Sequence, residues 1–337
     1  MGTFSGLTAR RRGGAALVTA VMAALVLTPL QPAQAADLGG FEVDGNVTPA
    51  GTRPTDWAAL GSGTCVVDGV DDASGYKGSE SSDVDSWSAE AVSTGKTDIV
   101  AIQTHSLVDD DSGHQWTYVA IQRATTEGST YFTFEYNQKA NHQSRPGGNG
   151  KSASVPTRTT GDLRLQFEQQ GNSANEVLGK IVVEGMDRWI GGKWVAQTVT
   201  ASAIAGLSNT MATAGLCGSA QAVPGAFMEV ALDLTVLGME PGCESGGFGT
   251  FNVRSRQSPA ETSEMSDVAT GTASVQPNCG AATITKRGPS GAVVGDSALR
   301  FEISPDPRDG NGTAYVNDDV TTGLAGNEVP DLSLIHI

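Results

Sequence analysis

The stretch YFTFEYNQ at positions 131–138 decides the fold class of this chain. Its apolar side chains Phe132, Phe134 and Tyr136 occupy every second position and alternate with more polar ones. A period of two places alternate side chains on opposite faces of a β-strand. The same alternation recurs at 163–168 and 230–236, so the sequence predicts a sheet with one buried face and one outer face.

Other segments also have the composition of strands. They lie at 98–104, 116–123, 177–184, 194–200 and 248–255. Gly191 and Gly192 separate apolar flanks at 189–194, which is typical of a hairpin. Two stretches are ambiguous: 262–269 fits a short helix, and 201–216 is rich in small residues and fits a loop. No helical periodicity extends beyond about two turns.

These strands favour one large domain, because β-sandwiches reach about 200–250 residues as a unit. We therefore predict an all-β fold with a large antiparallel, jelly-roll-like sandwich over residues 36–279 and a long surface loop at 141–160. A boundary is predicted near 277–280. Strands at 282–286 and 299–303 then begin a second β domain over 280–331, which is too short for an independent core and so is incomplete.

The composition agrees with an all-β chain. Only 17% of the residues are charged and 43 of 337 are glycine, against about 25% and about 7% in ordinary domains. These values exclude a coiled coil, a helical bundle and a basic nucleic-acid-binding protein.

The first 35 residues have the organisation of a signal peptide. Three arginines at 10–12 precede an apolar run over 15–30, and Ala33-Gln34-Ala35 supplies a small-x-small cleavage pattern. The run is shorter than the ~20 residues that span a bilayer. We therefore predict cleavage, no membrane insertion, and an extracellular or cell-wall-associated location. Cleavage leaves 18 Lys and Arg, three fewer than in the whole chain, against 37 Asp and Glu, and this net charge of −19 disfavours nucleic acid and anionic lipid as partners.

The four cysteines predict two disulfides in an exported chain. No pair has C-x-x-C spacing, which disfavours a zinc knuckle or a thioredoxin-type site. Four cysteines allow three connectivities. We favour Cys217–Cys243, which would tie the two ends of the strand at 230–236, together with Cys65–Cys279, which would join the beginning of the domain to its end.

Catalytic motifs are sparse. The chain has four histidines, no H-E-x-x-H motif and no G-x-S-x-G elbow. Glu135, Glu168 and Glu184 lie on predicted strands and offer the paired carboxylates of a glycoside hydrolase. The alternative is that they are solvated acids on the outer face. The E-x-D-x-x-E pattern of sandwich glucanases is absent after Glu135, so we expect no enzyme and no catalytic residue.

Acidic loops offer oxygen ligands for a structural calcium ion. The metal candidates are Asp109, Asp110 and Asp111, with further acids at 68–72 and 83–85. None of these segments matches the EF-hand loop. The alternative is an ordinary solvated acidic loop, and we expect no other cofactor.

Aromatic side chains leave two interpretations open. They either pack the core or form a sugar-stacking platform on an exposed sheet face. The set comprises Trp57, Trp87, Trp116, Trp189, Trp194, Tyr118, Tyr131 and Tyr136.

Over residues 40–279 the chain resembles the N-terminal β-rich domain of secreted surface proteins from high-GC Gram-positive bacteria. The resemblance rests on FEVDGN at 41–46, DW at 56–57, YFTFEYNQ at 131–138, GDL at 161–163, EVALDL at 229–234 and VRSR at 253–256. The Gly-rich loop around Pro146 and the second tryptophan of the 189–194 hairpin depart from the pattern. The resemblance implies a surface module and brings no catalytic residue with it.

Residues 280–331 resemble the opening of a prealbumin-like domain of the SpaA or Cna-B type, found in pilins and collagen-adhesin stalks. ITK at 284–286, GAVVG at 291–295 and LRFEI at 299–303 are similar to its first two strands. The resemblance implies a Lys–Asn isopeptide bond and places Lys286 at the lysine position. The strands that would carry the Asn and the acid are missing from the sequence, and an ordinary surface lysine is the alternative.

Together these features predict a secreted or cell-surface, non-enzymatic structural or adhesive module, the N-terminal head of a longer multidomain surface protein. Its expected partners are host or environmental surface glycans or proteins, and it is expected to be a monomeric module. The first alternative is a carbohydrate-binding, lectin-like domain, and the second is a glycoside hydrolase.

The last six residues, LSLIHI at 332–337, are what CTG TCT CTT ATA CAC ATC encodes. This sequence resembles the transposon end used to build sequencing libraries, so we expect an adapter artefact there. On this interpretation the native protein continues beyond Asp331, and His336 belongs to no site. The alternative is a natural edge strand.

Overall fold

The computed structural model describes residues 36–49, 55–68, 75–80, 83–90, 95–148, 150–152, 154–242 and 245–278. It also gives the backbone of four short strands, β18 (Ala281–Ala282), β19 (Arg300–Ile303), β20 (Ala314–Asn317) and β21 (Ile335–His336). Among these, β18 pairs with β21 and β19 with β20. The prealbumin-like domain stays a prediction, and Lys286 lies outside the described residues.

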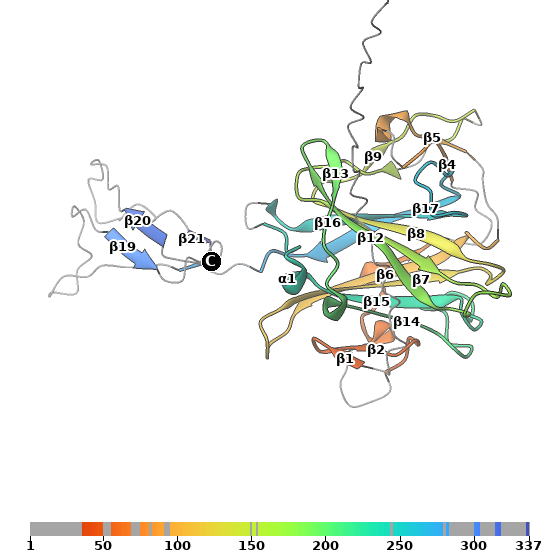
Figure 1. Cartoon of the computed structure of the whole chain (residues 1–337), viewed down its shortest axis with the longest axis horizontal. Coiled ribbons are helices and arrows are strands. Elements are labelled where there is room, and N and C mark those ends of the chain that lie inside the picture. Colours follow the sequence, from red (N-terminus) through yellow and green to blue (C-terminus); the bar gives the residue numbers. More distant parts are fainter. Residues whose placement is uncertain are drawn as a thin grey trace, which may run out of the picture.

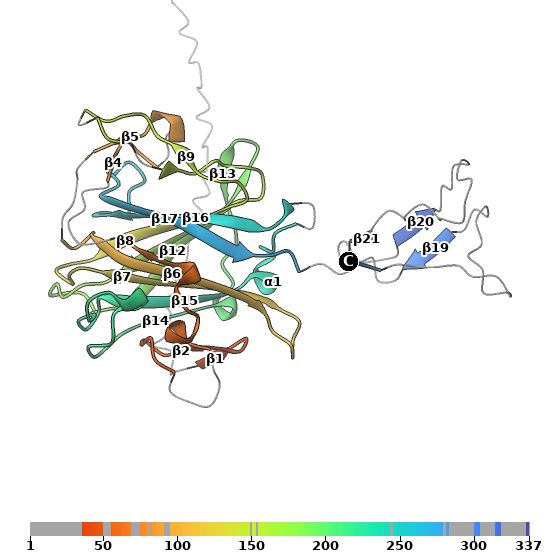
Figure 2. The ribbon, with the colours of Figure 1, turned by 180° about the vertical axis from the view of Figure 1, so that it is seen from behind.

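Two antiparallel sheets lie face to face, which confirms the predicted all-β sandwich (Figures 1 and 2). The larger sheet runs β13 (Lys193–Ala196), β12 (Ile181–Ile190), β11 (Leu163–Gln169), β8 (Thr130–Asn137), β16 (Phe248–Arg256) and β17 (Asp267–Val275). The smaller sheet runs β14 (Ile204–Ser208), β15 (Phe227–Asp233), β7 (Gln115–Arg123), β6 (Ile99–Val108) and β3 (Cys65–Val67).

The main core lies between the two sheets and follows the alternation in the sequence. Phe132, Phe134 and Tyr136 of β8 are fully buried there. Phe134 stacks on Phe251 of β16 with ring centroids 5.4 Å apart. The hydroxyl of Tyr136 lies 2.6 Å from Thr117 Oγ1 on the opposite sheet, which gives the phenol a buried hydrogen-bond partner.

The N-terminal segment covers the outer face of the smaller sheet. It contains β1 (Ala36–Leu38), β2 (Phe41–Val43), and the 3₁₀ turns η1 (Trp57–Ala59) and η2 (Ser62–Thr64). Phe41 and Trp57 pack against Tyr118 and Phe227 in a second buried cluster. Both faces of this sheet are therefore covered along β7 and β15.

Two segments cover part of the outer face of the larger sheet. The first carries β4 (Tyr76–Lys77), η3 (Val84–Ser86) and β5 (Ser88–Ala89), and the second carries β9 (His142–Gln143) and β10 (Ser154–Val155). Tyr76, Trp87, Val155 and Met265 form a third cluster beneath them. The expectation that 141–160 is only a surface loop was incomplete, because this segment closes over the sheet.

Some strand boundaries differ from the prediction. The alternating run at 230–236 leaves the sheet at Asp233 and becomes the short helix α1 (Leu234–Leu237). Asp233 caps this helix by accepting a 3.0 Å hydrogen bond from the Val236 backbone N–H, and Gly238 ends it in the left-handed conformation. The ambiguous stretches at 201–216 and 262–269 contribute β14 and the start of β17.

The disulfide prediction is wrong in its connectivity, because Cys217 pairs with Cys65. Cys65 begins β3 opposite Gln103 of β6, and Cys217 lies in η5 (Leu216–Gly218), with its sulfur near the Ile102 carbonyl of the same strand. The favoured Cys217–Cys243 pair is therefore excluded, because Cys217 is already bonded to Cys65. Cys65 is then not free for Cys279. Cys243 and Cys279 themselves lie outside the described residues.

Candidate functional site

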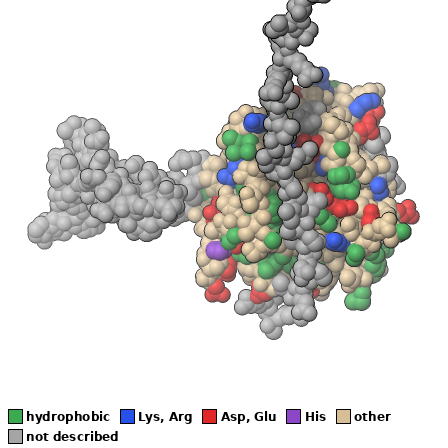
Figure 3. All heavy atoms as spheres, in the orientation of Figure 1, with side chains coloured by type: hydrophobic (Ala, Val, Ile, Leu, Met, Phe, Trp, Pro, Cys, Tyr) green, Lys and Arg blue, Asp and Glu red, His purple; other side chains and the backbone are tan. Residues whose placement is uncertain are grey.

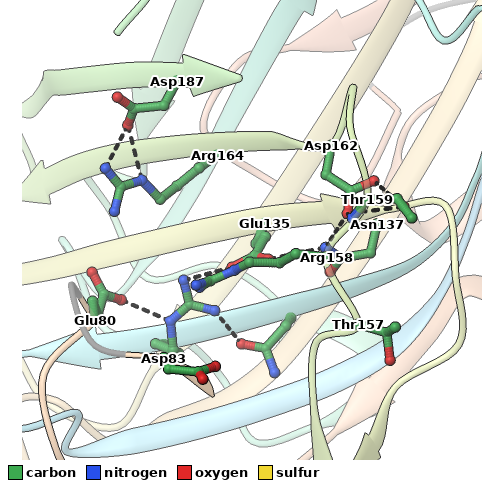
Figure 4. A network of polar contacts seen from close by, with 12 residues as sticks. Glu80, Asp83, Glu135, Asn137, Thr157, Arg158, Thr159, Asp162, Arg164 and Asp187 are labelled. Atoms are coloured by element: carbon green, nitrogen blue, oxygen red, sulfur yellow. Dashed lines mark hydrogen bonds and ion pairs between the residues drawn. The ribbon is translucent and has the colours of Figure 1, made fainter. Parts of the chain in front are cut away.

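Charged side chains occupy the covered outer face of the larger sheet (Figure 4). β8 contributes Glu135, β11 contributes Arg164, and β16 contributes Arg254 and Arg256. All four are buried. Because buried charges are costly unless they are paired, this face is the strongest candidate for a functional or architectural site.

Arg254 is the centre of this network. Its Nε donates to Glu80 Oε1 at 2.7 Å, its Nη1 donates to Asn252 Oδ1 at 2.5 Å, and its Nη2 lies 3.0 Å from Glu135 Oε2. Burial alone would lower the pKa of Arg254, but the carboxylates of Glu80 and Glu135 outweigh it and raise that pKa. The guanidinium therefore stays charged in the interior.

Arg158 ties the second covering segment to the same carboxylate. Its Nε and Nη2 donate to the two oxygens of Glu135 at 2.9 and 3.0 Å, as a bidentate pair. Burial would raise the pKa of Glu135, but Arg158 and Arg254 outweigh it and hold that pKa at about 2. Glu135 is thus ionised, and each of its oxygens faces a guanidinium.

The guanidinium of Arg158 also lies among three tryptophans. Its central carbon is 5.4 Å from the ring centroid of Trp87, 5.1 Å from that of Trp189 and 5.0 Å from that of Trp194. A guanidinium within about 6 Å of such a ring is attracted by the ring's quadrupole. These contacts fix the covering segment above the 189–194 hairpin.

A second ion pair extends the network along β11 and β12. Arg164 Nη2 lies 2.8 Å from Asp187 Oδ2 and 2.7 Å from Glu261 Oε1. Glu80 accepts a 2.9 Å hydrogen bond from the Thr133 hydroxyl and lies 3.5 Å from Arg256 Nε. These contacts join four arginines to four carboxylates.

Asp162 fixes the loop that leads into β11. It accepts hydrogen bonds from the backbone of Thr159 at 2.7 Å and of Gln138 at 3.1 Å, and from Asn137 Nδ2 at 3.0 Å. Burial raises the pKa of Asp162, although these three donors act in the opposite direction. The loop is therefore held by backbone contacts as well as by ion pairs.

The three glutamates considered for catalysis have different environments. Glu135 is fully buried, so it is not the solvated outer-face acid that the alternative interpretation expected. Glu168 and Glu184 are half-buried on the same sheet. Burial and the nearby Glu168 carboxylate raise the pKa of Glu184, and Tyr131 donates to Glu168 at 3.3 Å. Glu168 and Glu184 therefore keep the accessibility that Glu135 lacks.

The proposed calcium ligands are used by their own turn. Asp109 accepts hydrogen bonds from the backbone N–H groups of Asp111 and Ser112, both at 3.3 Å, and from the Ser112 hydroxyl at 2.5 Å. These bonds lower the pKa of Asp109. Asp110 and Asp111 are exposed. Within the part of the chain that the structure describes, no three His, Cys, Asp or Glu side chains are grouped to hold a metal ion.

The aromatic side chains divide between the two interpretations. Trp57, Trp87, Tyr118 and Tyr136 are buried, while Trp116, Trp189, Trp194 and Tyr131 are half-buried. Trp189 and Trp194 contact each other edge to face with centroids 5.1 Å apart. Only a part of the set therefore remains available to a ligand.

Sequence reasoning missed the partners of Glu135. Arg254 and Arg256 stand two positions apart at the end of a predicted strand, so their common face was detectable from the period of two. Glu80 and Arg158 lie in short irregular segments far away in sequence. No local pattern indicates that these segments return to the sheet.

A second buried carboxylate holds the N-terminal segment. Glu229 of β15 accepts hydrogen bonds from the Asp44 and Gly45 backbone N–H groups at 2.7 and 2.5 Å, and from Trp57 Nε1 at 2.7 Å. Burial raises the pKa of Glu229 well above its ordinary value despite these donors. Burial, with Asp44 and Glu42 nearby, also raises the pKa of Asp56 to about 7.

Replacing Asp56 with asparagine is expected to stabilise the protein at pH 8 and much less at pH 4. The folded state holds the Asp56 proton up to about pH 7, whereas an unfolded aspartate releases it near pH 4. Stability therefore falls as the pH rises through this window. The gain at pH 8 over pH 4 should be on the order of 2–4 kcal/mol.

Denaturant unfolding of the wild type and Asp56→Asn across this pH range measures that difference. Glu229 is present in both proteins, and the Asp56 charge contributes to its raised pKa, so the measured difference includes the effect of Asp56 on Glu229. The exposed Asp111→Asn is the control and should show no pH-dependent gain. A gain for Asp56→Asn that is equal at both pH values would contradict the argument.

In comparisons with known proteins, no family model, no curated protein and no solved structure matches this chain. Among the described residues, no helix is long and apolar enough to cross a membrane.

Proposed function

We propose that the chain is a secreted or cell-surface, non-enzymatic module with a structural or adhesive role, the N-terminal head of a longer multidomain surface protein. The observation that carries the proposal is the closed polar face of the larger sheet. Glu135 there is occupied by Arg158 and Arg254, which pin a covering segment to the sheet. Loops fixed in this way bind a partner at a lower entropic cost than free loops.

The proposed location is extracellular or at the cell wall. It rests on the leader-like segment at 1–35, and the resemblance to Gram-positive surface proteins points the same way. Residues 280–331 would then begin a prealbumin-like stalk domain. Surface glycans or proteins would be the partners.

The exposed surface suits a monomeric module. On the face drawn in Figure 3, hydrophobic side chains form small separate patches with acidic and basic side chains between them. Among the described residues, the exposed large hydrophobic side chains of Leu178, Met211 and Val223 belong to loops that meet around Asn209 and Gly225. Stable interfaces between subunits typically bury larger continuous apolar patches, so we propose a monomer.

A panel of polysaccharides tests the non-enzymatic role. We expect no product above background from the wild type. Turnover that disappears in folded Glu135→Gln, Glu168→Gln or Glu184→Gln, and persists in the exposed control Glu127→Gln, would establish a glycoside hydrolase instead. Circular dichroism and thermal unfolding of each variant separate loss of activity from loss of fold.

A lectin-like role is the second candidate, favoured by the half-buried Trp189–Trp194 pair. Such rings could stack on a sugar from the side away from Arg158. A glycan array, read with and without calcium, discriminates between the two roles. Saturable binding that is lost in Trp194→Ala would favour the lectin, whereas retention on protein-coated surfaces alone would favour the adhesive module.

A further inference from the structure

A hollow of about 370 Å³ lies near the end of β8, and Arg254 is not among its lining residues. Four segments contribute to it: the end of β8, the turn before β11, the end of β12, and the loop after α1. Its lining residues are Gln138, Thr160, Gly161, Arg188, Glu240, Pro241, Gly242 and Ser245. This volume is at the lower end of the range for small-molecule sites, about 300–1,000 Å³.

Arg188 is the only arginine among the lining residues, and its donors are poorly used. Among the described residues, no carboxylate lies within ion-pair distance of its guanidinium, and its Nε is buried without a hydrogen-bond partner. Its Nη2 reaches the Glu240 backbone carbonyl at a long 3.4 Å. Burial lowers the pKa of Arg188 with no carboxylate to offset it.

Arg123, which is almost fully buried, provides a contrast to the half-buried Arg188. It also has no carboxylate in contact among the described residues, yet backbone carbonyls and a hydroxyl take up its donors. Nη1 donates to Gly128 O and Thr130 Oγ1, both at 2.9 Å, and Nη2 donates to Gln170 O at 3.1 Å. Among the described residues, Arg188 has no such set of acceptors, although it lines a hollow. Leaving a buried donor unsatisfied costs about 1–3 kcal/mol.

We propose that the hollow is a binding site for the carboxylate of a small organic acid the size of one sugar acid, received by Arg188. The Nε and Nη2 edge of a guanidinium matches the two oxygens of a carboxylate in a bidentate pair. Such a ligand would give Nε the acceptor that it lacks. This binding site goes beyond the adhesive role and does not depend on it.

Glu240 sets the orientation of the ligand. Its Oε1 accepts a 2.7 Å hydrogen bond from the Thr235 hydroxyl, which holds this side chain in the lining of the hollow. A second negative charge on the ligand would meet this carboxylate, so the site favours a single carboxylate at Arg188. Neutral hydroxyl groups, which donate hydrogen bonds, suit the Glu240 side.

Arginine-selective ¹⁵N NMR of the full chain at pH 7 tests the proposal. We expect sodium glucuronate to shift the Arg188 Nε–Hε signal saturably, whereas glucose and the methyl ester of glucuronate leave it unchanged. Acetate distinguishes the source: equal affinity for acetate points to a free acid, and preference for glucuronate points to a uronic acid of a glycan. No saturable shift with glucuronate, or an equal shift with glucose, overturns the proposal.

Variants provide an independent arm. Arg188→Gln should weaken glucuronate binding about ten- to a hundredfold, because it removes the charge-assisted bidentate pair. Arg188→Lys keeps the positive charge but cannot form the bidentate pair, so it should lose less affinity for glucuronate than Arg188→Gln. The exposed Arg145→Gln is the matched control and should bind like the wild type. Unchanged binding by Arg188→Gln overturns the proposal.

The fold of Arg188→Gln is checked by thermal unfolding. Arg188 makes no ion pair with the described residues. The thermal unfolding midpoint of Arg188→Gln should therefore not fall below that of the wild type. If this variant does not fold, the comparison of glucuronate with its methyl ester on the wild type decides the question alone. If the protein proves not to be adhesive, glucuronate should still shift the Arg188 Nε–Hε signal. Failure of the adhesive role and failure of this binding site are therefore distinguishable.

Discussion

Replacing both Cys65 and Cys217 with serine is expected to lower the free energy of unfolding by about 5 kcal/mol. The bridge joins residues 152 positions apart, one in an edge strand and one in η5. A crosslink over so long a loop removes much of the conformational entropy of the unfolded chain. Denaturant unfolding of the double variant measures the loss, and replacing both residues leaves neither partner thiol unpaired.

A peptide map without reduction tests the pairing directly. We expect one linked peptide that contains Cys65 and Cys217. The control variant Cys243→Ser/Cys279→Ser keeps this bridge and should retain that peptide and its contribution to stability. A Cys217–Cys243 or Cys65–Cys279 peptide from the wild type would refute the connectivity described above.

The second large effect is expected for Arg254→Met, which should cost about 3–5 kcal/mol. Methionine fills much of the space of the arginine stem but leaves Glu80 and Glu135 short of a positive charge in the interior. Arg158 still faces Glu135, and Arg256 still faces Glu80 at 3.5 Å, so a folded variant is expected. Guanidinium chloride unfolding measures the difference, with the exposed Arg145→Met as the control.

Lowering the pH should reduce the difference in the free energy of unfolding between the wild type and Arg254→Met. The folded pKa of Glu135 is about 2, below the value of about 4.3 for an unfolded glutamate. Its contribution to stability is therefore present above about pH 4 and is lost as the pH falls through about 2. A double-mutant cycle with Glu80→Gln gives the coupling energy. A coupling near zero, with an equal loss at pH 3 and pH 7, would show that Arg254 acts only through its volume.

The strands that carry the core were predictable because their two faces differ. The alternate apolar side chains of β8 and β11 are all buried in the structure, because they pack against the opposite sheet. β14 and β17 were harder to recognise because small residues such as Gly206 and Gly271 dilute their pattern. The alternation of apolar residues in the sequence continues past Asp233, but the chain forms the helix α1 there. The capping residues at the two ends of α1 therefore decide its structure, and the alternation does not.

The candidate site was less predictable for a different reason. Glu135 was found in the sequence, but its environment depends on Glu80, Arg158 and Arg254, which come from three other segments. An outer-face position is normally solvated, and only the covering segments reverse that expectation. The same limitation applies to Arg188, since a lone arginine near a strand end gives no sign that a hollow lies beside it.

The pairing of β8 with both β11 and β16 has a consequence for how this protein reaches its native state. β16 contributes Arg254, whose contact with Glu80 spans 174 positions of the chain, and the contact of Glu229 with Trp57 spans 172. Contacts of this range require large loops to close before they return any favourable energy, so folding is slow. A nascent chain that ends before β16 would leave one edge of β8 without its neighbour. We therefore expect folding to be post-translational, with refolding times in the millisecond-to-second range typical of β-sandwiches or longer.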